Sequence, residues 1–285
     1  MSFGGRALAI FLLLCSVAAA SESEWQFEDW EGPPLRVKMF VPEDSGPETK
    51  IVIIMHGASR DVPRYYRDWK ALGEEMGFIV VVPEFSAANF KGSAGYNLGH
   101  VFDPDTGNLR PKESWTFSAI EPLFDDVVSR LAGTQKSYTI YGHSAGSQFV
   151  HRFLYYVPEA RASRFLAANA GWYTLPVADF DYPYGFPNSG LDDSELPRIL
   201  AAPLVILLGR EDTDKTQENL RKTPEAQKQG PNRLARGLTM YRVAKSRAEA
   251  LGVDFAWQIV IVDGADHNNA KMAPAAARVA LNKKQ

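Results

Sequence analysis

The sequence predicts an α/β protein whose mostly parallel central sheet carries helices on both faces. Short apolar runs rich in β-branched residues alternate along the chain with longer segments in which apolar residues recur at a helical period. This alternation is typical of parallel strands joined by helical crossovers. The expected strands are Leu35–Val41, Ile51–Met55, Phe78–Val82, Tyr138–Tyr141, Phe165–Ala168, Leu204–Leu208 and Phe255–Val262. The stretch Trp25–Trp30 is expected to add an antiparallel edge strand.

Five segments between these strands have helical periodicity. In Trp115–Leu131 the apolar residues fall on one stripe, which is the pattern of a helix lying on a core. The last segment begins with Pro274, at the first helical position, where a missing N–H is harmless. The expected helices are Pro63–Met76, Trp115–Leu131, Ser147–Tyr156, Arg233–Leu251 and Pro274–Leu281.

The first twenty residues resemble a secretory signal peptide. Met1–Arg6 carries one basic side chain, Ala7–Cys15 is an unbroken apolar run, and Ala18-Ala19-Ala20 offers small residues for cleavage. The apolar run is much shorter than the roughly 20 residues of a spanning helix, which disfavours a membrane anchor. We therefore expect residues 1–20 to be removed and 21–285 to form one exported domain, periplasmic or extracellular. A lipoprotein attached through Cys15 stays open as an alternative.

The mature chain has a composition that disfavours several classes of partner. Removing Arg6 from the 31 basic residues leaves 30 against 34 acidic residues, with no basic cluster for a nucleic acid and no further stretch for stable membrane insertion. The only cysteine is Cys15. No glycine-rich phosphate loop, cysteine pair or His-Glu-x-x-His helix is present, so we expect neither cofactor nor metal.

Two connections are longer than a compact α/β unit requires, Ser86–Glu113 and Gly171–Pro197. The second is rich in aromatic residues, and we expect it to form a partial cap in which Trp172 and Tyr173 contact an apolar or aromatic part of the substrate. Alternatively, these rings only pack the loop onto the sheet. The polar segment Gln217–Arg236 is expected to be a solvated excursion.

The segment Gly142-His143-Ser144-Ala145-Gly146 lies between a predicted strand and a predicted helix. A Gly-x-Ser-x-Gly turn in this context holds a serine hydroxyl clear of the backbone, where it can attack a carbonyl carbon. Ser144 is therefore the expected nucleophile. The oxyanion that forms needs waiting backbone N–H groups, and we expect these from Ala145 and from Ala58, in the turn after Ile51–Met55.

Five histidines compete for the role of general base. His143 is adjacent to Ser144, so its side chain should point elsewhere, and His151 lies about 10 Å along the same helix. His56 belongs to the oxyanion turn, and His100 lies in the first long loop. His267 follows the last predicted strand and should reach the same sheet edge as Ser144, so it is the expected base.

The imidazole needs a carboxylate that fixes its tautomer and stabilises its positive charge. Glu211, Asp212 and Asp214 all follow the strand Leu204–Leu208. Asp212 is preferred, while Asp214 and Glu211 remain open. Asp266, the neighbour of His267, is interpreted as a turn residue.

With these residues in the order Ser, Asp, His, the chain resembles the α/β-hydrolase superfamily. More narrowly it is similar to secreted bacterial esterases of the polyhydroxybutyrate depolymerase and feruloyl esterase kind. The resemblance implies hydrolysis of a small or oligomeric carboxylic ester through an acyl-enzyme on Ser144, His267 and Asp212. Peptidase or amidase activity with the same triad, and a binding protein that has lost turnover, are the alternatives.

Overall fold

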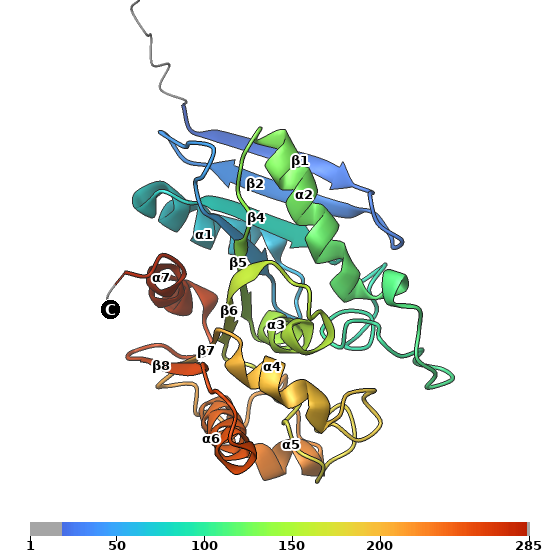
Figure 1. Cartoon of the computed structure of the whole chain (residues 1–285). Coiled ribbons are helices and arrows are strands. Elements are labelled where there is room, and N and C mark those ends of the chain that lie inside the picture. The colour runs from blue at the N-terminus through green and yellow to red at the C-terminus, as the bar shows by residue number, and fades with distance from the viewer. Residues whose placement is uncertain (1–18, 284–285) are drawn as a thin grey trace, which may run out of the picture.

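The computed structural model describes residues 19–283, so nearly all of the predicted signal peptide lies outside the described part. The centre of the domain is one eight-stranded sheet of order β1-β2-β4-β3-β5-β6-β7-β8 (Figure 1). The strands are β1 (Ser21–Phe27), β2 (Leu35–Val41), β3 (Ile51–Met55), β4 (Ile79–Glu84), β5 (Tyr138–His143), β6 (Ala162–Ala168), β7 (Leu204–Gly209) and β8 (Gln258–Val262).

The sheet is mostly parallel, as predicted. Strand β2 pairs antiparallel with both β1 and β4, whereas β4, β3, β5, β6, β7 and β8 pair parallel with their neighbours in that order. The antiparallel edge strand predicted near Trp25 is therefore present as β1. Because β3, β5, β7 and β8 run in the same direction, their carboxyl ends meet at one edge of the sheet, where α/β proteins bind ligands.

Helices cover both faces of this sheet. They are α1 (Val62–Met76), α2 (Ile120–Arg130), α3 (Ala145–Tyr156), α4 (Leu196–Ala201), α5 (Pro224–Gln229), α6 (Arg233–Leu251) and α7 (Asn269–Ala280). Figure 1 shows α1 and α7 together on one side of the sheet and α2, α3 and α6 on the other.

Strand β3 shows how one buried strand serves two cores. Ile53 faces the core beneath α2 and α3, and its neighbours Val52 and Ile54 face the core beneath α1 and α7. Successive side chains point to opposite faces, so a strand covered on both sides must be apolar throughout. This explains the continuous apolar run that predicted the strand.

The predicted start of the last helix is wrong. Helix α7 begins at Asn269, and Pro274 lies inside it. The Asn268 side chain accepts a hydrogen bond from the Ala270 N–H, and this cap fixes the start one turn and more before the proline. The short helices α4 and α5 were not predicted, since six residues are too few to display a helical period.

The prediction that Gln217–Arg236 is a solvated excursion is also wrong. Leu220, Ala226 and Gln229 are buried, and so are Arg233 and Arg236. Both arginines donate hydrogen bonds to oxygen atoms inside the protein. Composition alone does not distinguish such arginines from solvated ones.

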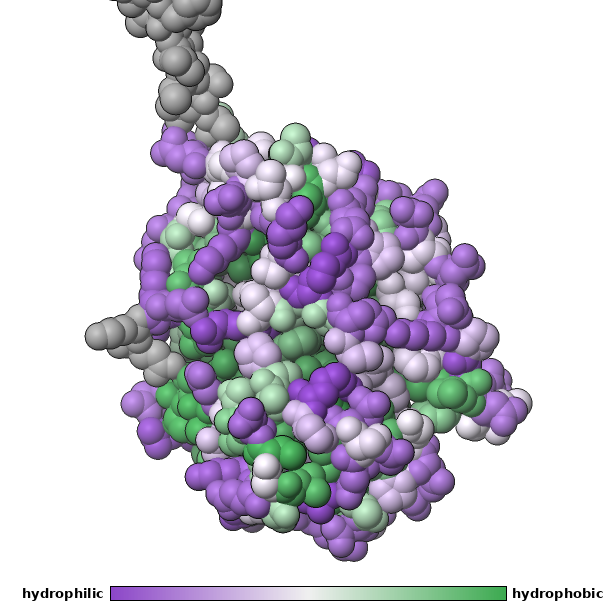
Figure 2. All heavy atoms as spheres, viewed as in Figure 1, coloured by the Kyte–Doolittle hydropathy of each residue, from purple (hydrophilic) through white to green (hydrophobic). Residues whose placement is uncertain are grey.

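The surface is predominantly polar. Figure 2 shows hydrophilic residues over most of the visible face, with apolar groups between them, several of them toward the lower left of the view. Large apolar side chains that are exposed include Leu109, Leu238 and Leu251, which come from different parts of the chain. Within residues 19–283, no helix is both long enough and apolar enough to span a bilayer.

Candidate active site

Ser144 occupies a tight turn between β5 and α3. Its backbone has φ 59° and ψ −114°, a conformation that non-glycine residues rarely adopt. The flanking glycines allow this turn, because a Cβ at Gly146 would lie 2.1 Å from the Met55 carbonyl oxygen and one at Gly142 would lie 2.1 Å from the Gly146 oxygen. The strained turn directs the serine out of the sheet edge, in the geometry expected of a nucleophile.

His267 connects Ser144 with Asp212. Its Nε2 lies 3.1 Å from Ser144 Oγ, and its Nδ1 lies 2.8 Å from Asp212 Oδ2. A carboxylate only accepts hydrogen bonds, so Nδ1 carries the proton and Nε2 is free to accept the serine proton. The three residues follow β5, β7 and β8, so the parallel sheet brings together side chains that are far apart in the sequence.

Asp212 is the acid at the imidazole, and the alternatives are elsewhere. Asp212 is buried, whereas Asp214 and Glu211 are exposed. Asp214 binds the backbone N–H and hydroxyl of Thr216 in its own loop, which lowers the pKa of its carboxyl. Asp212 also receives a longer, 3.5 Å contact from Arg233, so both carboxylate oxygens have a partner.

The turn after β3 packs against the serine. A Cβ built on Gly57 would lie 3.7 Å from Ser144 Cβ, and Ala58 and Ala145 line the same cavity as Ser144. The turn is held by His56, whose carbonyl accepts the Tyr96 hydroxyl at 2.7 Å and whose Nε2 accepts the Phe85 N–H at 3.0 Å. The residues predicted to donate to an oxyanion are therefore neighbours of the serine.

Three other histidines are fully buried, and burial lowers the pKa of each, that of His56 to about 3. His151 accepts the Thr174 N–H and does not reach the serine. His143 is not the base either, but its ring lies 4.7 Å from the ring of His267. Its Nδ1 bonds the Tyr65 hydroxyl at 2.9 Å. Sequence reasoning missed this neighbour of the base, because it considered only the direction of His143 relative to Ser144.

A cavity of about 270 Å³ opens beside Ser144. Trp172 lines it, as predicted, but Tyr173 does not: its side chain is fully buried, and its backbone bonds the Gln229 side chain. Tyr184 and Phe186 pack against Trp172 and Tyr155 instead of facing the cavity. Most of the lining residues have polar or charged side chains, but Trp172 and Leu220 also leave room for the expected apolar or aromatic group of a substrate. The lining residues are Ala58, Ser93, Asn97, Ser144, Ala145, Gln148, Gly171, Trp172, Glu218, Asn219, Leu220, Arg221 and Arg233.

No protein-family model and no curated protein matches this sequence. Among solved structures, poly(aspartic acid) hydrolase-1 from Sphingomonas sp. KT-1 is 41% identical and superposes with a TM-score of 0.89 over 93% of this chain and 100% of that one. This chain belongs to the α/β-hydrolase superfamily. It is also 30% identical to the poly(3-hydroxybutyrate) depolymerase of Bordetella parapertussis, with a TM-score of 0.84 over 92% of the present chain and 89% of the depolymerase.

These two relatives confirm the predicted fold class and the predicted resemblance to polyhydroxybutyrate depolymerases. An S-formylglutathione hydrolase from Staphylococcus aureus, 15% identical with a TM-score of 0.59 over 93% of this chain and 98% of that one, shares the fold. In the present chain, residues 19–283 contain no group of three or more His, Cys, Asp or Glu residues arranged to hold a metal ion.

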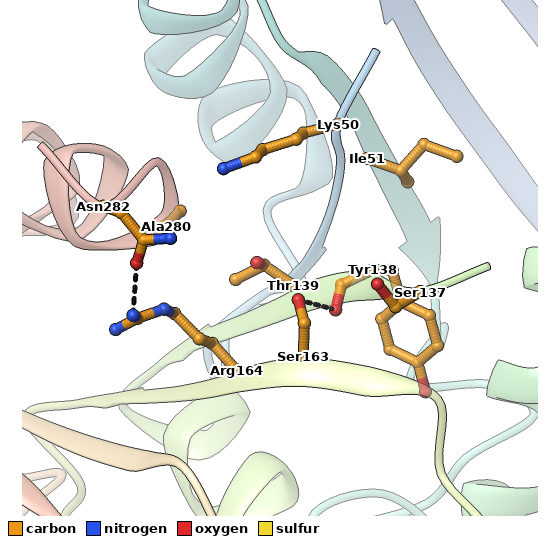
Figure 3. A pocket seen from close by; sticks show the side chains of 9 residues that line it. All are labelled: Lys50, Ile51, Ser137, Tyr138, Thr139, Ser163, Arg164, Ala280 and Asn282. Atoms are coloured by element: carbon orange, nitrogen blue, oxygen red, sulfur yellow. Dashed lines mark hydrogen bonds between the residues drawn. The ribbon is translucent and has the colours of Figure 1, made fainter. Parts of the chain in front are cut away.

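A second hollow lies at the opposite edge of the sheet (Figure 3). It is found where β3, β5 and β6 begin, and its lining includes Lys50, Tyr138 and Arg164. There the Ser163 hydroxyl donates to the Tyr138 carbonyl, and the Arg164 guanidinium bonds Asn282. The predicted catalytic residues of the hydrolase all lie at the other edge.

Proposed function

We propose that this hydrolase is a serine enzyme that cleaves carboxylic esters through an acyl-enzyme on Ser144. The observation that carries the proposal is the continuous hydrogen-bonded chain from Ser144 Oγ through His267 to buried Asp212. A serine hydroxyl is a poor nucleophile on its own, and this chain supplies the base and the carboxylate that orients it.

In the proposed reaction His267 Nε2 takes the proton of Ser144 as the oxygen attacks the substrate carbonyl. The tetrahedral intermediate expels the leaving group, which receives the proton from His267, and the serine ester remains. Water, deprotonated by His267, then attacks this ester and releases the acid and free Ser144. Asp212 stabilises the imidazolium in both halves of the reaction.

The negative charge of each intermediate is assigned to the backbone N–H groups of Ala58 and Ala145. Ala145 is the first residue of α3, where the helix dipole also favours an anion. Loss of one such donor typically costs about 10²–10³ in rate. Trp172 is assigned to substrate binding, because it lines the cavity that contains Ser144.

Amide hydrolysis is a second candidate, and the similarity to poly(aspartic acid) hydrolase-1 favours it, since that substrate is a polyamide. The poly(3-hydroxybutyrate) depolymerase instead acts on a polyester. Both reactions use the same acyl-enzyme. A panel of alkyl esters and anilides with matched acyl groups separates them. We expect kcat/KM to be higher for the esters than for the matched anilides, and the reverse order would assign the enzyme to amides.

The direct test of the serine mechanism is labelling with a fluorophosphonate probe. Wild-type protein is expected to be labelled at Ser144, and Ser144→Ala is expected to remain unlabelled and to lose at least about 10⁴ in kcat. A folded wild-type protein that is neither labelled nor active would instead support a binding protein with the same fold.

We also propose that residues 1–20 direct export and are then removed, leaving a domain that is not inserted in the membrane. The charged start, the apolar run and the three alanines support this. The N-terminal sequence of protein recovered from the periplasm or the medium tests it, with Ser21 as the expected first residue. A lipid-modified Cys15 at the N-terminus would support the lipoprotein alternative.

A further inference from the structure

Four arginines lie in or directly behind the wall of the active-site cavity, and we call them the arginine cluster. Arg221 and Arg233 line the cavity, whereas Arg152 and Arg236 lie behind it and contact the lining residues Trp172, Gly171 and Arg221. Arg152, Arg233 and Arg236 are almost completely buried, and Arg221 is exposed in the cavity wall. The whole sequence carries a formal charge of −3, so this local concentration of positive charge is not a general property of the molecule.

Two of the buried arginines form no ion pair within residues 19–283. Arg152 donates to the Thr174 hydroxyl and to two main-chain carbonyls, and its Nη2 is buried with no partner in the described chain. Arg236 donates to main-chain carbonyls. Burial lowers the pKa of both to about 10, so both remain charged at neutral pH. Burying a charge without a counterion is costly, and here hydrogen bonds to neutral oxygen atoms offset the cost without removing the positive charge.

Arg236 fixes the part of the wall that faces the substrate. Its guanidinium donates to the carbonyl of Gly171, which precedes Trp172, and to the carbonyl of Arg221 itself. One side chain thus ties together two segments about fifty residues apart. The indole of Trp172 lies against two guanidinium groups, that of Arg152 at 4.2 Å and that of Arg221 at 4.8 Å from the ring centroid.

Arg221 is held in place but has no counterion. Its Nε donates to the Tyr184 hydroxyl, and its terminal nitrogens form no hydrogen bond or ion pair with another described residue. The fork of the guanidinium is therefore free to bind a carboxylate through two parallel hydrogen bonds. Because the Arg221 side chain already contacts Tyr184 and Trp172, and Arg236 holds its backbone carbonyl, little further entropy is lost when an anion binds.

Of the four arginines only Arg233 has an acidic partner among the described residues, and that partner is Asp212. Asp212 is shared between His267 and Arg233, and Asp214 is turned into its own loop. Glu218 is the carboxylate in the cavity lining, and it is exposed and forms no ion pair with Arg221. The adjoining hollow adds Lys215 and Lys222, whose charge has the same sign as that of the arginine cluster.

We propose that the cavity beside Ser144 binds a carboxylate of the substrate, held by the free fork of Arg221 and favoured by the buried charge of the arginine cluster. The substrate class is then an acidic chain or diacid derivative whose free carboxylate lies a few bonds from the carbonyl that Ser144 attacks. This inference rests on the proposed function for the identity of the reacting carbonyl, but the binding of the anion can be tested without any reaction.

The test is calorimetric titration of Ser144→Ala, which cannot turn over, with N-acetyl-triaspartyl amide and with the uncharged N-acetyl-triasparaginyl amide. The acidic peptide is expected to bind at least tenfold more tightly at low salt, and the difference is expected to shrink as salt rises. Equal affinities, or no measurable binding of the acidic peptide, overturn the proposal.

Variants locate the anion. Adding Arg221→Gln is expected to reduce the preference for the acidic peptide at least tenfold, and Arg221→Lys, which keeps the charge but not the fork, is expected to recover part of it. Arg242→Gln is the matched control, because Arg242 is exposed on α6 and bonds only the nearby Thr239. A preference that survives Arg221→Gln unchanged overturns the assignment.

The proposed function fails independently of this inference. Fluorophosphonate labelling of Ser144 without acidic-peptide binding would leave the serine mechanism intact and remove the carboxylate site. If the acidic peptide binds in a way that depends on Arg221 but wild-type protein is not labelled, the carboxylate site stands and the serine mechanism is wrong.

Discussion

The strand-end triad and the arginine-lined wall lie on either side of one cavity but are built differently. Ser144, Asp212 and His267 each follow a parallel strand, so the sheet itself sets their relative positions. The wall is assembled from loops, and Arg236 joins its segments through carbonyl groups at Gly171 and Arg221. In the proposed function, the chemistry therefore depends on the rigid sheet, and substrate selectivity depends on long-range hydrogen bonds between loops.

Asp212 is where the two regions meet, since it binds His267 through one oxygen and Arg233 through the other. Asp212 thus orients the histidine of the triad and is also the counterion of Arg233 in the wall. Substitution of this shared residue, and of residues that belong to one region alone, shows whether the two regions depend on separate residues.

Asp212→Asn is expected to lower kcat by about 10⁴, equivalent to about 5 kcal/mol, because the amide no longer fixes the imidazole tautomer or stabilises its charge. The measurement is steady-state hydrolysis of an activated ester, with denaturant unfolding to show that the variant is folded. Asp214→Asn is the matched control and is expected to change kcat less than twofold. If instead Asp214→Asn has the larger effect, the assignment of the acid is wrong.

The two regions share a dependence on buried neutral histidines. His143 lies beside the triad, His151 supports the wall through Thr174, and His56 holds the oxyanion turn, each with its pKa lowered by burial. In the unfolded chain each histidine is protonated as the pH falls through its ordinary pKa of about 6.5, whereas in the folded chain it stays neutral at that pH. Stability is therefore expected to be constant above about pH 7 and to fall below about pH 6.5.

The expected loss between pH 7 and pH 5.5 is about 4 kcal/mol for the three histidines together, since each contributes up to about 1.4 kcal/mol per pH unit. Denaturant unfolding at three pH values measures it. His143→Gln and His151→Gln are each expected to make the dependence about one third shallower. An unfolding free energy that is flat over this range would contradict the prediction.

Gly146→Ala tests the close packing beneath the triad. The added Cβ would lie 2.1 Å from the Met55 carbonyl oxygen, and main chain cannot move aside cheaply. We expect a loss of about 3 kcal/mol in the free energy of unfolding, with a fall in kcat as the Ser144 turn shifts. Gly46→Ala is the control, because a Cβ there meets nothing within 4 Å, and it is expected to change stability by less than about 1 kcal/mol. Equal effects of the two substitutions would show that the turn is more adaptable than its contacts indicate.

The sequence predicts these regions to different extents. The strands Leu35–Val41 and Ile51–Met55 have the predicted bounds, because a strand buried on both faces leaves an unmistakable apolar run. The last strand begins three residues after its predicted start at Phe255, since the Ala256 backbone N–H bonds the Leu200 carbonyl instead of β7. The Trp257 indole N–H bonds the neighbouring Ile199 carbonyl. Periodicity records that a residue is buried, and it does not record which partner its backbone finds.

The candidate site divides in the same way. Ser144, Asp212 and His267 were predictable because each occupies a position that the fold class fixes, the carboxyl end of a strand. Arg221 and the buried Arg236 were not predictable, since their role depends on carbonyl groups of distant loops that no local pattern marks. Tyr173 was predicted to contact the substrate because it belongs to the aromatic-rich loop Gly171–Pro197. Its side chain is buried instead, and only its neighbour Trp172 lines the cavity.

The smallest expected effect concerns the support of the base. Tyr65→Phe removes the hydroxyl that bonds His143 Nδ1, and the other ring nitrogen of His143 already lacks a partner in the described chain. An unsatisfied buried nitrogen costs about 1–3 kcal/mol of stability, and the His143 ring that packs on His267 is then held less firmly. We expect kcat to fall about tenfold, or about 1.4 kcal/mol, with KM nearly unchanged.

Tyr66→Phe is the matched control for this substitution. Its hydroxyl bonds Glu22 and the Met39 carbonyl, away from the triad, so it is expected to cost similar stability without lowering kcat. If the two variants lower kcat equally, the His143 contact does not position the base, and the triad is held by its strand ends alone. If only Tyr65→Phe lowers kcat, even the sheet-borne half of the site depends on a long-range side-chain contact, because Tyr65 and His143 are 78 residues apart.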